Sequence, residues 1–275
     1  RYWALHLVDH LKAVLAVLDT EKPDVIVNFA AQGEGAASFG ADSPLFYRTN
    51  TLGLVALIEG LRSRSYVHRF VQIGSSEVYG SVKEASQEMD CLRPSSPYAV
   101  SKAAFDQHLE IMHRIHGFPA NVIRPSNAYC PGQQLHRIIP KAILCALGGK
   151  KLQLQGGGKA EKSYLHATDL SKGIMKVLDR GAIGRIYNCG PHDPLSIKAV
   201  VMGVAAACRV PYESFVEEAP DRVGQDSCYW LNSTRLRGLG WTDEIGLMTG
   251  IEGMVEWVKK YPALLKADTT VRVRP

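Results

Sequence analysis

The chain has 275 residues, of which 46% are hydrophobic and 21% are charged, and its formal net charge is +5. This balance supplies a packed core and excludes an intrinsically disordered chain. The mild positive charge favours anionic ligands, but the Lys and Arg residues are scattered, so we expect no nucleic-acid partner. The apolar runs are too short to cross a membrane and no signal peptide is evident, so we expect no membrane association.

The predicted elements of the first half alternate between helices and short apolar strands. Helical periodicity ends before Pro23, and a continuous apolar run follows it. In chain order we predict a helix over 7–18, a strand over 24–31, a helix over 43–61, a strand over 69–74, a helix over 98–116 and a strand over 120–124. Strands separated by helices of this length predict βαβ units and a parallel sheet. Their uniform apolar character predicts strands that are covered on both faces.

After Pro131 the pattern changes, because Gly-rich and Pro-rich joints become frequent. We predict helices over 138–147, 169–178, 197–208 and 246–261, and strands over 151–154 and 186–189. We therefore divide the chain into a first domain, residues 1–130, and a smaller lobe, residues 131–275, with some segments of the second half returning to the first domain. Ligands of such folds bind at the carboxyl ends of the parallel strands.

The cysteines and histidines give no sign of a disulfide framework or a metal centre. The six Cys residues are widely spaced and form no CxxC pair: Cys91, Cys130, Cys145, Cys189, Cys208 and Cys228. This spacing predicts reduced thiols in a cytoplasmic protein. The nine His residues lack the spacing of metal ligands, so we expect no metal site.

Tyr98 and Lys102 form a YxxxK motif inside a predicted helix. Residues four apart share one face of a helix, so the phenol and the ammonium should lie side by side. A nearby positive charge favours phenolate, and we expect it to lower the pKa of Tyr98 towards neutrality. Such a tyrosine can remove a proton from a hydroxyl while hydride leaves the same carbon. Taken alone, the motif also fits a partly exposed helix face.

A second motif, Gly74-Ser75-Ser76-Glu77, begins where a predicted strand ends. Ser75 can hydrogen-bond a hydroxyl that is being oxidised, and Glu77 can act as a base beside it. Ser and Glu residues at such a position also serve as simple turn residues. A strand-end Ser followed about 20 residues later by YxxxK is much rarer by chance than either motif, so the pair indicates an oxidoreduction site.

These motifs resemble those of the extended short-chain dehydrogenases/reductases, and most closely the NDP-sugar 4,6-dehydratases of the dTDP-glucose type. The matching stretches are Val27–Ala31, Thr49–Asn50 with Gly53, Ser76–Gly80, Ser96–Ala104, Arg124–Asn127, Ile139–Pro140, Tyr187–Asn188 and Asp221–Asp226. The resemblance implies an α/β fold with a doubly wound parallel sheet of the Rossmann type and a smaller C-terminal α/β substrate lobe. It also implies NAD as cofactor, a nucleotide-diphosphate sugar as substrate, and a homodimer formed through helices 43–61 and 98–116.

The resemblance also implies roles for individual residues. The catalytic set would be Ser75, Ser76, Glu77, Tyr98 and Lys102. The cofactor-binding set would be Ala30, Ala31, Gln32, Asn50, Gly74, Tyr98, Lys102, Pro125 and Ser126. The substrate-binding set would be Glu34, Asn127, Lys162, Asn188 and Arg222. Lys162 stands where the family usually has Arg, which keeps the charge but gives up a bidentate contact with phosphate.

Glu77 favours a dehydratase within this family. After oxidation at C4, its carboxylate can remove the C5 proton, water leaves from C6, and hydride returns to C6. A solvated turn carboxylate is the alternative interpretation of Glu77. Ser76 replaces the Asp of the dTDP-glucose enzymes and resembles GDP-mannose 4,6-dehydratases and UDP-glucuronate decarboxylases. The loop 32–38 departs from the family pattern and suggests a different sugar, although its Glu34 equally fits a solvated loop.

The glycine-rich phosphate-binding loop of the first βα unit is missing from the sequence, which begins Arg1-Tyr2-Trp3 rather than with Met. We expect this unit either upstream of the sequence or truly absent, in which case NAD would bind poorly. The leading hypothesis is an NAD-dependent nucleotide-sugar 4,6-dehydratase. A 4-epimerase or a UDP-glucuronate-type decarboxylase of the same fold, and a catalytically inactive dinucleotide-binding protein, are the alternatives.

Overall fold

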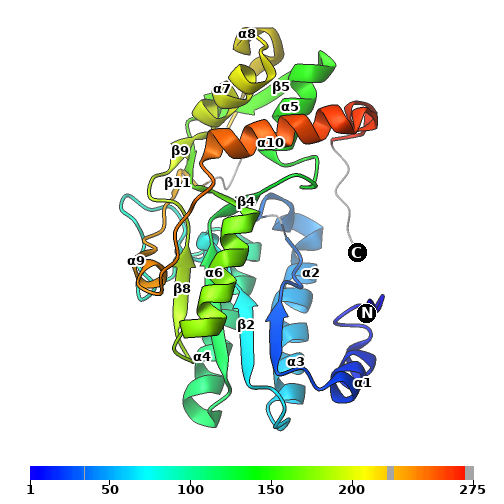
Figure 1. The fold of residues 1–275 in the computed structure, drawn as a ribbon, viewed down its shortest axis with the longest axis vertical. Helices are drawn as coiled ribbons and strands as arrows, with labels where there is room; N and C mark the ends of the chain where they lie inside the picture. The colour runs from blue at the N-terminus through cyan, green and yellow to red at the C-terminus, as the bar shows by residue number, and fades with distance from the viewer. Residues whose placement is uncertain (34, 222–225, 270–275) are drawn as a thin grey trace.

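A parallel sheet forms the centre of the larger part of the molecule (Figure 1). The computed structural model describes residues 1–33, 35–221 and 226–269. The sheet has the order β1 (Val25–Asn28), β2 (Arg69–Ile73), β3 (Ala120–Pro125) and β8 (Ile186–Cys189), and each neighbouring pair is parallel. The α/β fold with a parallel, Rossmann-type sheet that the sequence predicts is confirmed.

Helices cover both faces of this sheet, because successive strand residues point to opposite sides. Phe70 of β2 packs with α1 (Leu11–Glu21), α3 (Leu54–Leu61) and α4 (Pro97–His116) on one face. Its neighbour Val71 packs with α6 (Ala167–Arg180) on the other face. Both side chains are fully buried, as expected for strands covered on two sides.

The predicted helix over 43–61 is interrupted by a π-helical turn. It consists of α2 (Ser43–Tyr47), the π-helical segment η3 (Arg48–Gly53) and α3. Asn50 lies in this turn and is completely buried. Such turns are rare and recur at functional sites, so the loop that Asn50 contacts is a candidate part of a functional site.

The strand predicted over 24–31 ends early, at Asn28, because the Asn28 side chain takes over the hydrogen bonding. Its Nδ2 donates to Oε1 of Gln72 at 2.7 Å, and its Oδ1 accepts from the backbone N–H of Ala30 at 3.2 Å. This local bond turns the backbone out of the strand. Likewise the first predicted helix begins only at Leu11 and ends where Lys22 adopts the left-handed conformation.

A second group of elements, here called the C-terminal lobe, lies above the carboxyl ends of the strands (top of Figure 1). Its core is formed by α5 (Ile138–Gly148), α7 (Ile197–Cys208), α8 (Tyr212–Phe215) and α10 (Leu247–Lys260), which pack around the parallel pair β5 (Leu152–Gln155) and β10 (Val216–Ala219). The helix predicted over 197–208 and the strand predicted over 186–189 match the observed bounds. The domain boundary at residue 130 stays a prediction.

Several short elements that the sequence does not reveal connect the sheet to the C-terminal lobe. A three-stranded sheet has the order β11 (Cys228–Tyr229), β6 (Glu161–Lys162), β9 (Leu195–Ser196), and a second pair joins β4 (Asn127–Tyr129) to β7 (Tyr164–His166). The helix α9 (Thr234–Arg237) and the 3₁₀ turns η1 (Gly35–Ser38), η2 (Gly40–Asp42), η4 (Ser76–Tyr79), η5 (Gly156–Gly158) and η6 (Pro262–Lys266) complete the described elements. No helix within the described ranges is long and apolar enough to cross a membrane.

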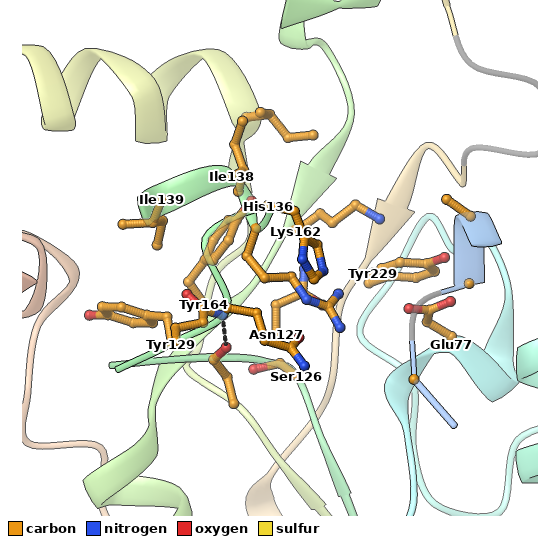
Figure 2. A pocket seen from close by; sticks show the side chains of 18 of the residues that line it. Glu77, Ser126, Asn127, Tyr129, His136, Ile138, Ile139, Lys162, Tyr164 and Tyr229 are labelled. Atoms are coloured by element: carbon orange, nitrogen blue, oxygen red, sulfur yellow. Dashed lines mark hydrogen bonds between the residues drawn. The ribbon is translucent and has the colours of Figure 1, made fainter. Parts of the chain in front are cut away.

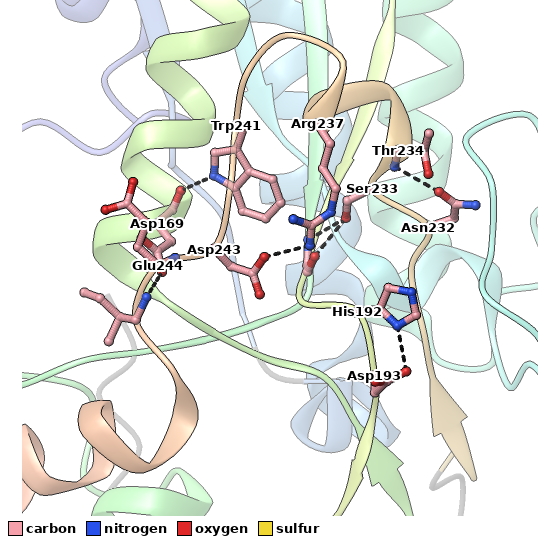
Figure 3. A network of polar contacts seen from close by, with 12 residues as sticks. Asp169, His192, Asp193, Asn232, Ser233, Thr234, Arg237, Trp241, Asp243 and Glu244 are labelled. Atoms are coloured by element: carbon pink, nitrogen blue, oxygen red, sulfur yellow. Dashed lines mark hydrogen bonds and ion pairs between the residues drawn. The ribbon is translucent and has the colours of Figure 1, made fainter.

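A buried carboxylate ties α10 to α6 (Figure 3). Asp169 lies in the first turn of α6 and is fully buried. Its Oδ2 accepts from the backbone N–H groups of Glu244 and Ile245 at 3.0 and 2.8 Å, and its backbone carbonyl accepts from Nε1 of Trp241 at 2.8 Å. Charge-assisted bonds of this kind fix the loop that leads into α10.

We predict that Asp169→Ala lowers the free energy of unfolding by about 2–4 kcal/mol, because two buried backbone N–H groups lose their acceptor. Chemical denaturation measures this change. The matched control is Asp179→Ala on the same helix, whose side chain is 67% exposed and pairs only with the exposed Arg180. We expect the control to change stability by less than about 0.5 kcal/mol; equal losses in the two variants would contradict the role of Asp169.

Candidate active site

A cavity of about 760 Å³ lies between the carboxyl ends of the central strands and the C-terminal lobe. Nine of the predicted site residues line it: Gly74, Ser75, Ser76, Glu77, Tyr98, Pro125, Ser126, Asn127 and Lys162. Figure 2 shows Ser126 and Asn127 on the floor of the cavity, Ile138 and Ile139 towards the C-terminal lobe, and Glu77 near Tyr229 on one side of the view. The topology thus gathers residues that lie far apart in the sequence.

Glu77 is positioned by a short 3₁₀ turn that Ser75 initiates. The Ser75 hydroxyl accepts from the backbone N–H of Glu77 at 3.2 Å and so caps η4. The loop at Gly35 passes very close to the carboxylate, since a Cβ atom at Gly35 would lie 2.6 Å from Oε2 of Glu77. A larger residue at position 35 would therefore displace the Glu77 carboxylate from its present position. Gly35, within the stretch that departs from the family pattern, therefore lies directly against Glu77.

Tyr98 and Lys102 both lie on α4, which begins after a cap by Ser96, whose Oγ accepts from the backbone N–H of Ala99 at 3.1 Å. Tyr98 reaches the cavity, whereas Lys102 lies behind it and is only 3% exposed. The Lys102 ammonium donates to the carbonyl of Ile73 at 2.6 Å. The charge is therefore held at the end of β2.

The titration of this pair differs from the expectation. Burial, followed by the negative charge of Glu77, raises the pKa of Tyr98 to about 12, while the Ser75 hydroxyl and the Arg137 guanidinium act in the opposite direction. Burial lowers the pKa of Lys102 to about 8, against the attraction of Asp106. The prediction that Lys102 brings the pKa of Tyr98 towards neutrality is wrong for the ligand-free protein, because desolvation and the Glu77 charge outweigh the effects of the Ser75 hydroxyl and the Arg137 guanidinium.

A buried polar network lies behind the cavity wall. Arg124 donates from Nε to Oδ2 of Asp106 at 2.8 Å, and both side chains are almost fully buried. Nη1 of Arg124 donates to the Tyr79 hydroxyl at 2.7 Å, and this hydroxyl donates to Oδ1 of Asn188 at 2.9 Å. The network therefore joins α4, β3, η4 and β8, the elements that carry or adjoin the residues of the cavity.

Two of the predicted ligand-binding residues, Asn50 and Asn188, bond other parts of the chain. Asn50 is fully buried, and it bonds the backbone of Gln32 in both directions, with its Oδ1 accepting at 2.7 Å and its Nδ2 donating at 2.9 Å. Asn188 is also fully buried, and its amide is engaged by Tyr79 and by the carbonyl of Ser86 at 2.8 Å. Neither lines the cavity, and both hold surrounding chain in place. Their contact with a ligand stays a prediction.

The remaining predicted site residues lie at the edge of the cavity or outside the residues that the structure describes. Ala30 and Ala31 are exposed and Gln32 is half-buried, directly after β1. They form an open rim beside the cavity and do not line it. The predicted substrate residues Glu34 and Arg222 lie outside the described residues.

The cavity also contains residues that sequence reasoning did not identify. Arg137, at the N-cap of α5, brings a guanidinium to the wall, and Tyr164 and Tyr229 add aromatic surface. The Lys162 ammonium lies 3.6 Å from the centre of the Tyr229 ring. The position of Arg137 just before the Ile138-Ile139-Pro140 stretch was the only sequence signal available. Among the described residues, no group of His, Cys, Asp and Glu could hold a metal ion.

The chain is similar in sequence to known proteins. The family model described as the NAD dependent epimerase/dehydratase family matches residues 5–190. A dTDP-glucose 4,6-dehydratase of Streptomyces griseus is 37% identical over 240 residues, which cover 86% of this chain and 72% of the relative. A trifunctional enzyme of Arabidopsis thaliana, whose name begins with UDP-glucose 4,6-dehydratase, is 31% identical over 250 residues; these cover 90% of this chain but only 37% of the relative.

Solved structures agree with this result. The dTDP-glucose 4,6-dehydratase of Streptomyces venezuelae, solved with NAD bound, superposes with a TM-score of 0.87 at 30% identity, over 96% of this chain and 80% of that one. The UDP-glucose 4-epimerase of Thermus thermophilus, also solved with NAD, gives a TM-score of 0.85 at 27% identity, over 93% of this chain and 83% of that one.

The titration of Lys102 leads to a prediction about stability. A pKa of about 8, below the ordinary 10.5, means that the folded protein binds fewer protons here than the unfolded chain between these values. The resulting cost is fully present below about pH 8 and disappears as the pH rises past 10.5. We expect Lys102→Met to raise the free energy of unfolding at pH 7 by about 1–3 kcal/mol, with a smaller gain at higher pH.

Chemical denaturation at a series of pH values between 7 and about 10 measures this effect. Lys259→Met is the matched control, because Lys259 is exposed on α10 and pairs with the nearby Glu256. Its effect should not depend on pH across this range. A loss of stability in Lys102→Met at every pH would show that the bond to Ile73 outweighs the burial cost.

Proposed function

Since the chain belongs to the NAD-dependent epimerase/dehydratase family, we propose that it acts as an NAD-dependent nucleotide-sugar 4,6-dehydratase. The observation that carries this proposal is the Glu77 carboxylate on the wall of a cavity that also contains Ser75 and Tyr98. A simple epimerase needs no carboxylate base at this place. The relatives named dTDP-glucose 4,6-dehydratases, at 29–37% identity, support the same activity.

The residues at the carboxyl ends of the strands suit a nicotinamide cofactor. Ser126 has a buried hydroxyl without a hydrogen-bond partner in the described structure, and it faces the cavity beside Pro125 and Gly74. A buried hydroxyl of this kind calls for a polar ligand group. Ser126, Pro125, Tyr98 and Lys102 would hold the nicotinamide end, and the rim at Ala30–Gln32 would continue the site. NAD, when bound, supplies the hydride acceptor and donor of the reaction.

The side chains of this chain perform the proton transfers. The Ser75 hydroxyl hydrogen-bonds the sugar C4 hydroxyl. Tyr98 takes the proton of that hydroxyl during oxidation as the phenolate, so its own proton must first leave to solvent, which requires bound ligands to lower its pKa from the raised value of the ligand-free protein. The 4-keto group makes the C5 proton acidic, and Glu77 removes that proton before water leaves from C6. Ser76, buried beside Glu77, is a poor acid, so Glu77 itself or a water molecule protonates the leaving hydroxyl.

The substrate diphosphate would bind the cationic side of the cavity. Asn127 and Lys162 both line the cavity, and the Asn127 backbone N–H donates to the Ser163 carbonyl at 3.1 Å. We propose that both contact the phosphates, together with Arg222. Selectivity for the nucleotide base and the sugar would depend on the walls formed by Gly33, Gly35 and Ala36 and by the segment before α5.

A second activity is favoured by one specific observation. Decarboxylation of a nucleotide uronic acid needs a basic residue that recognises the C6 carboxylate, and Arg137 brings a guanidinium into the cavity. A guanidinium binds a carboxylate through two parallel hydrogen bonds. Incubation of the full-length protein with NAD and UDP-glucuronate tests this activity through release of carbon dioxide.

For the dehydratase, we predict that the full-length protein with NAD converts at least one nucleotide hexose into a 4-keto-6-deoxy product, detected by mass spectrometry as loss of water. Glu77→Gln should lower kcat for water loss by at least about 100-fold, while C4 oxidation continues and reduced nicotinamide accumulates. Glu84→Gln, on an exposed loop residue, is the matched control. Unchanged water loss in Glu77→Gln, or no product from any hexose, would overturn the proposal.

We also propose that the protein is a homodimer located in the cytoplasm. The face of α2, η3 and α4 carries exposed apolar side chains, among them Leu45, Leu52 and Ile111, exposed by 41%, 66% and 48%. Such an apolar surface favours association with a second copy. All six cysteines carry free thiols, which suits a reducing compartment.

The dimer proposal predicts that Leu52→Asp shifts the protein from dimer to monomer in sedimentation velocity experiments, because a charge would be buried in the interface. Met175→Asp is the control, since Met175 is 62% exposed but lies on α6 at the opposite face of the sheet. A monomeric unmodified protein would contradict the proposal.

A further inference from the structure

The Lys162 ammonium is held against an aromatic ring that is itself fixed by a buried carboxylate. Lys162 of β6 and Tyr229 of β11 are directly paired across neighbouring parallel strands. The ammonium lies 3.6 Å from the ring centre, which is close contact for a cation over an aromatic face. Tyr229 is only 6% exposed, so this contact is largely shielded from water.

The orientation of Tyr229 is set by Asp226. The phenol donates to Oδ2 of Asp226 at 2.5 Å, and Asp226 is also buried. The other donors to this carboxylate are the hydroxyls of Ser81, at 2.7 Å to Oδ1, and of Ser95. Both serines belong to the segment between Glu77 and Tyr98. Asp226 therefore connects the strand that carries Tyr229 to the chain on which the proposed catalytic groups lie.

The contact with Tyr229 restricts the flexible side chain of Lys162. A lysine has a flexible stem and no planar fork, so it loses more side-chain freedom than arginine for each hydrogen bond with a phosphate. The ring occupies one side of the ammonium and limits its rotation. Lys162 also lines the cavity, where its charge can attract an anion.

We propose that Tyr229 is a positioning residue for Lys162, and that Asp226 holds Tyr229 in place, so that the Asp226–Tyr229–Lys162 series sets the affinity for the substrate diphosphate. This inference rests on the proposed function, in which Lys162 contacts the diphosphate. It assigns Tyr229 a role in binding and none in the chemical step. Loss of the ring should therefore raise KM and leave kcat nearly unchanged.

The test is a double-mutant cycle on binding of a nucleoside diphosphate, dTDP or UDP, whichever the full-length protein binds more tightly in calorimetry. We expect Tyr229→Leu to weaken binding by about tenfold, and Lys162→Ala by about 10–100-fold. In the Lys162→Ala background, Tyr229→Leu should change the Kd by less than about twofold, because the ring acts only through the ammonium. Tyr229→Phe keeps the ring and should lose less than Tyr229→Leu.

A purely structural role of Tyr229 gives a different pattern, because its loss would then multiply with that of Lys162. Tyr212→Leu, a tyrosine at the edge of the core of the C-terminal lobe, is the matched control and should bind normally. Multiplicative losses, unchanged binding in Tyr229→Leu, or no binding of either diphosphate by the unmodified protein would overturn the inference. The expected binding pattern without any dehydrated product would overturn the proposed activity alone.

Discussion

The buried ion pair between Asp106 and Arg124 is the interaction on which the arrangement of the site depends. It joins the helix that carries Tyr98 and Lys102 to the strand that leads into Pro125 and Ser126. Burying two charges is costly, and the geometry must be good for the attraction to offset this cost. Arg124 also donates a hydrogen bond to the Tyr79 hydroxyl, so the same guanidinium fixes the turn that carries Glu77.

The charges in front of this network are divided between the walls of the cavity. Among the described residues that line the cavity, Glu77 is the acidic one, while Arg137, Lys141 and Lys162 supply positive charge. The pKa of Tyr98 responds to both signs, since Glu77 raises it and Arg137 lowers it. In the ligand-free protein the phenol therefore stays protonated at neutral pH. A bound anion near Arg137 and a bound cofactor near Tyr98 would both alter this balance, which couples ligand binding to proton transfer.

The sequence was most informative where one physical rule decides the outcome. Periodic helices and the ends of apolar strands were predicted to within a few residues. Ser75 and Glu77, taken from a strand end, and Tyr98, taken from the YxxxK motif, line the same cavity. Sequence-based prediction failed where a side chain has several possible hydrogen-bond partners in the fold. The spacing of four residues places Lys102 on the face of Tyr98, but only the fold shows that its ammonium reaches the Ile73 carbonyl.

Local sequence also does not reveal which partners Asn50, Asn188 and Tyr229 contact in the fold. Asn50 and Asn188 occur in motifs typical of the family, yet nothing in the local sequence distinguishes an amide that faces a ligand from one that holds a loop. Tyr229 lies on a strand of two residues, too short for any periodic signal. Its role depends on pairing with a strand more than sixty residues away, as the register of Tyr229 with Lys162 shows.

The π-helical turn at Arg48–Gly53 has a consequence for how this protein can change in evolution. An α-helix turns by about 100° per residue, so one extra residue within a helix rotates everything after it by that angle. Here the rotation lets Asn50 face Gln32 while Leu54, Leu57 and Ile58 still face the sheet. After a single-residue deletion in this turn, either Asn50 would lose its contact with Gln32 or the following leucines would no longer face the core. Insertions and deletions should therefore be tolerated elsewhere on this helix sooner than in its π-helical turn.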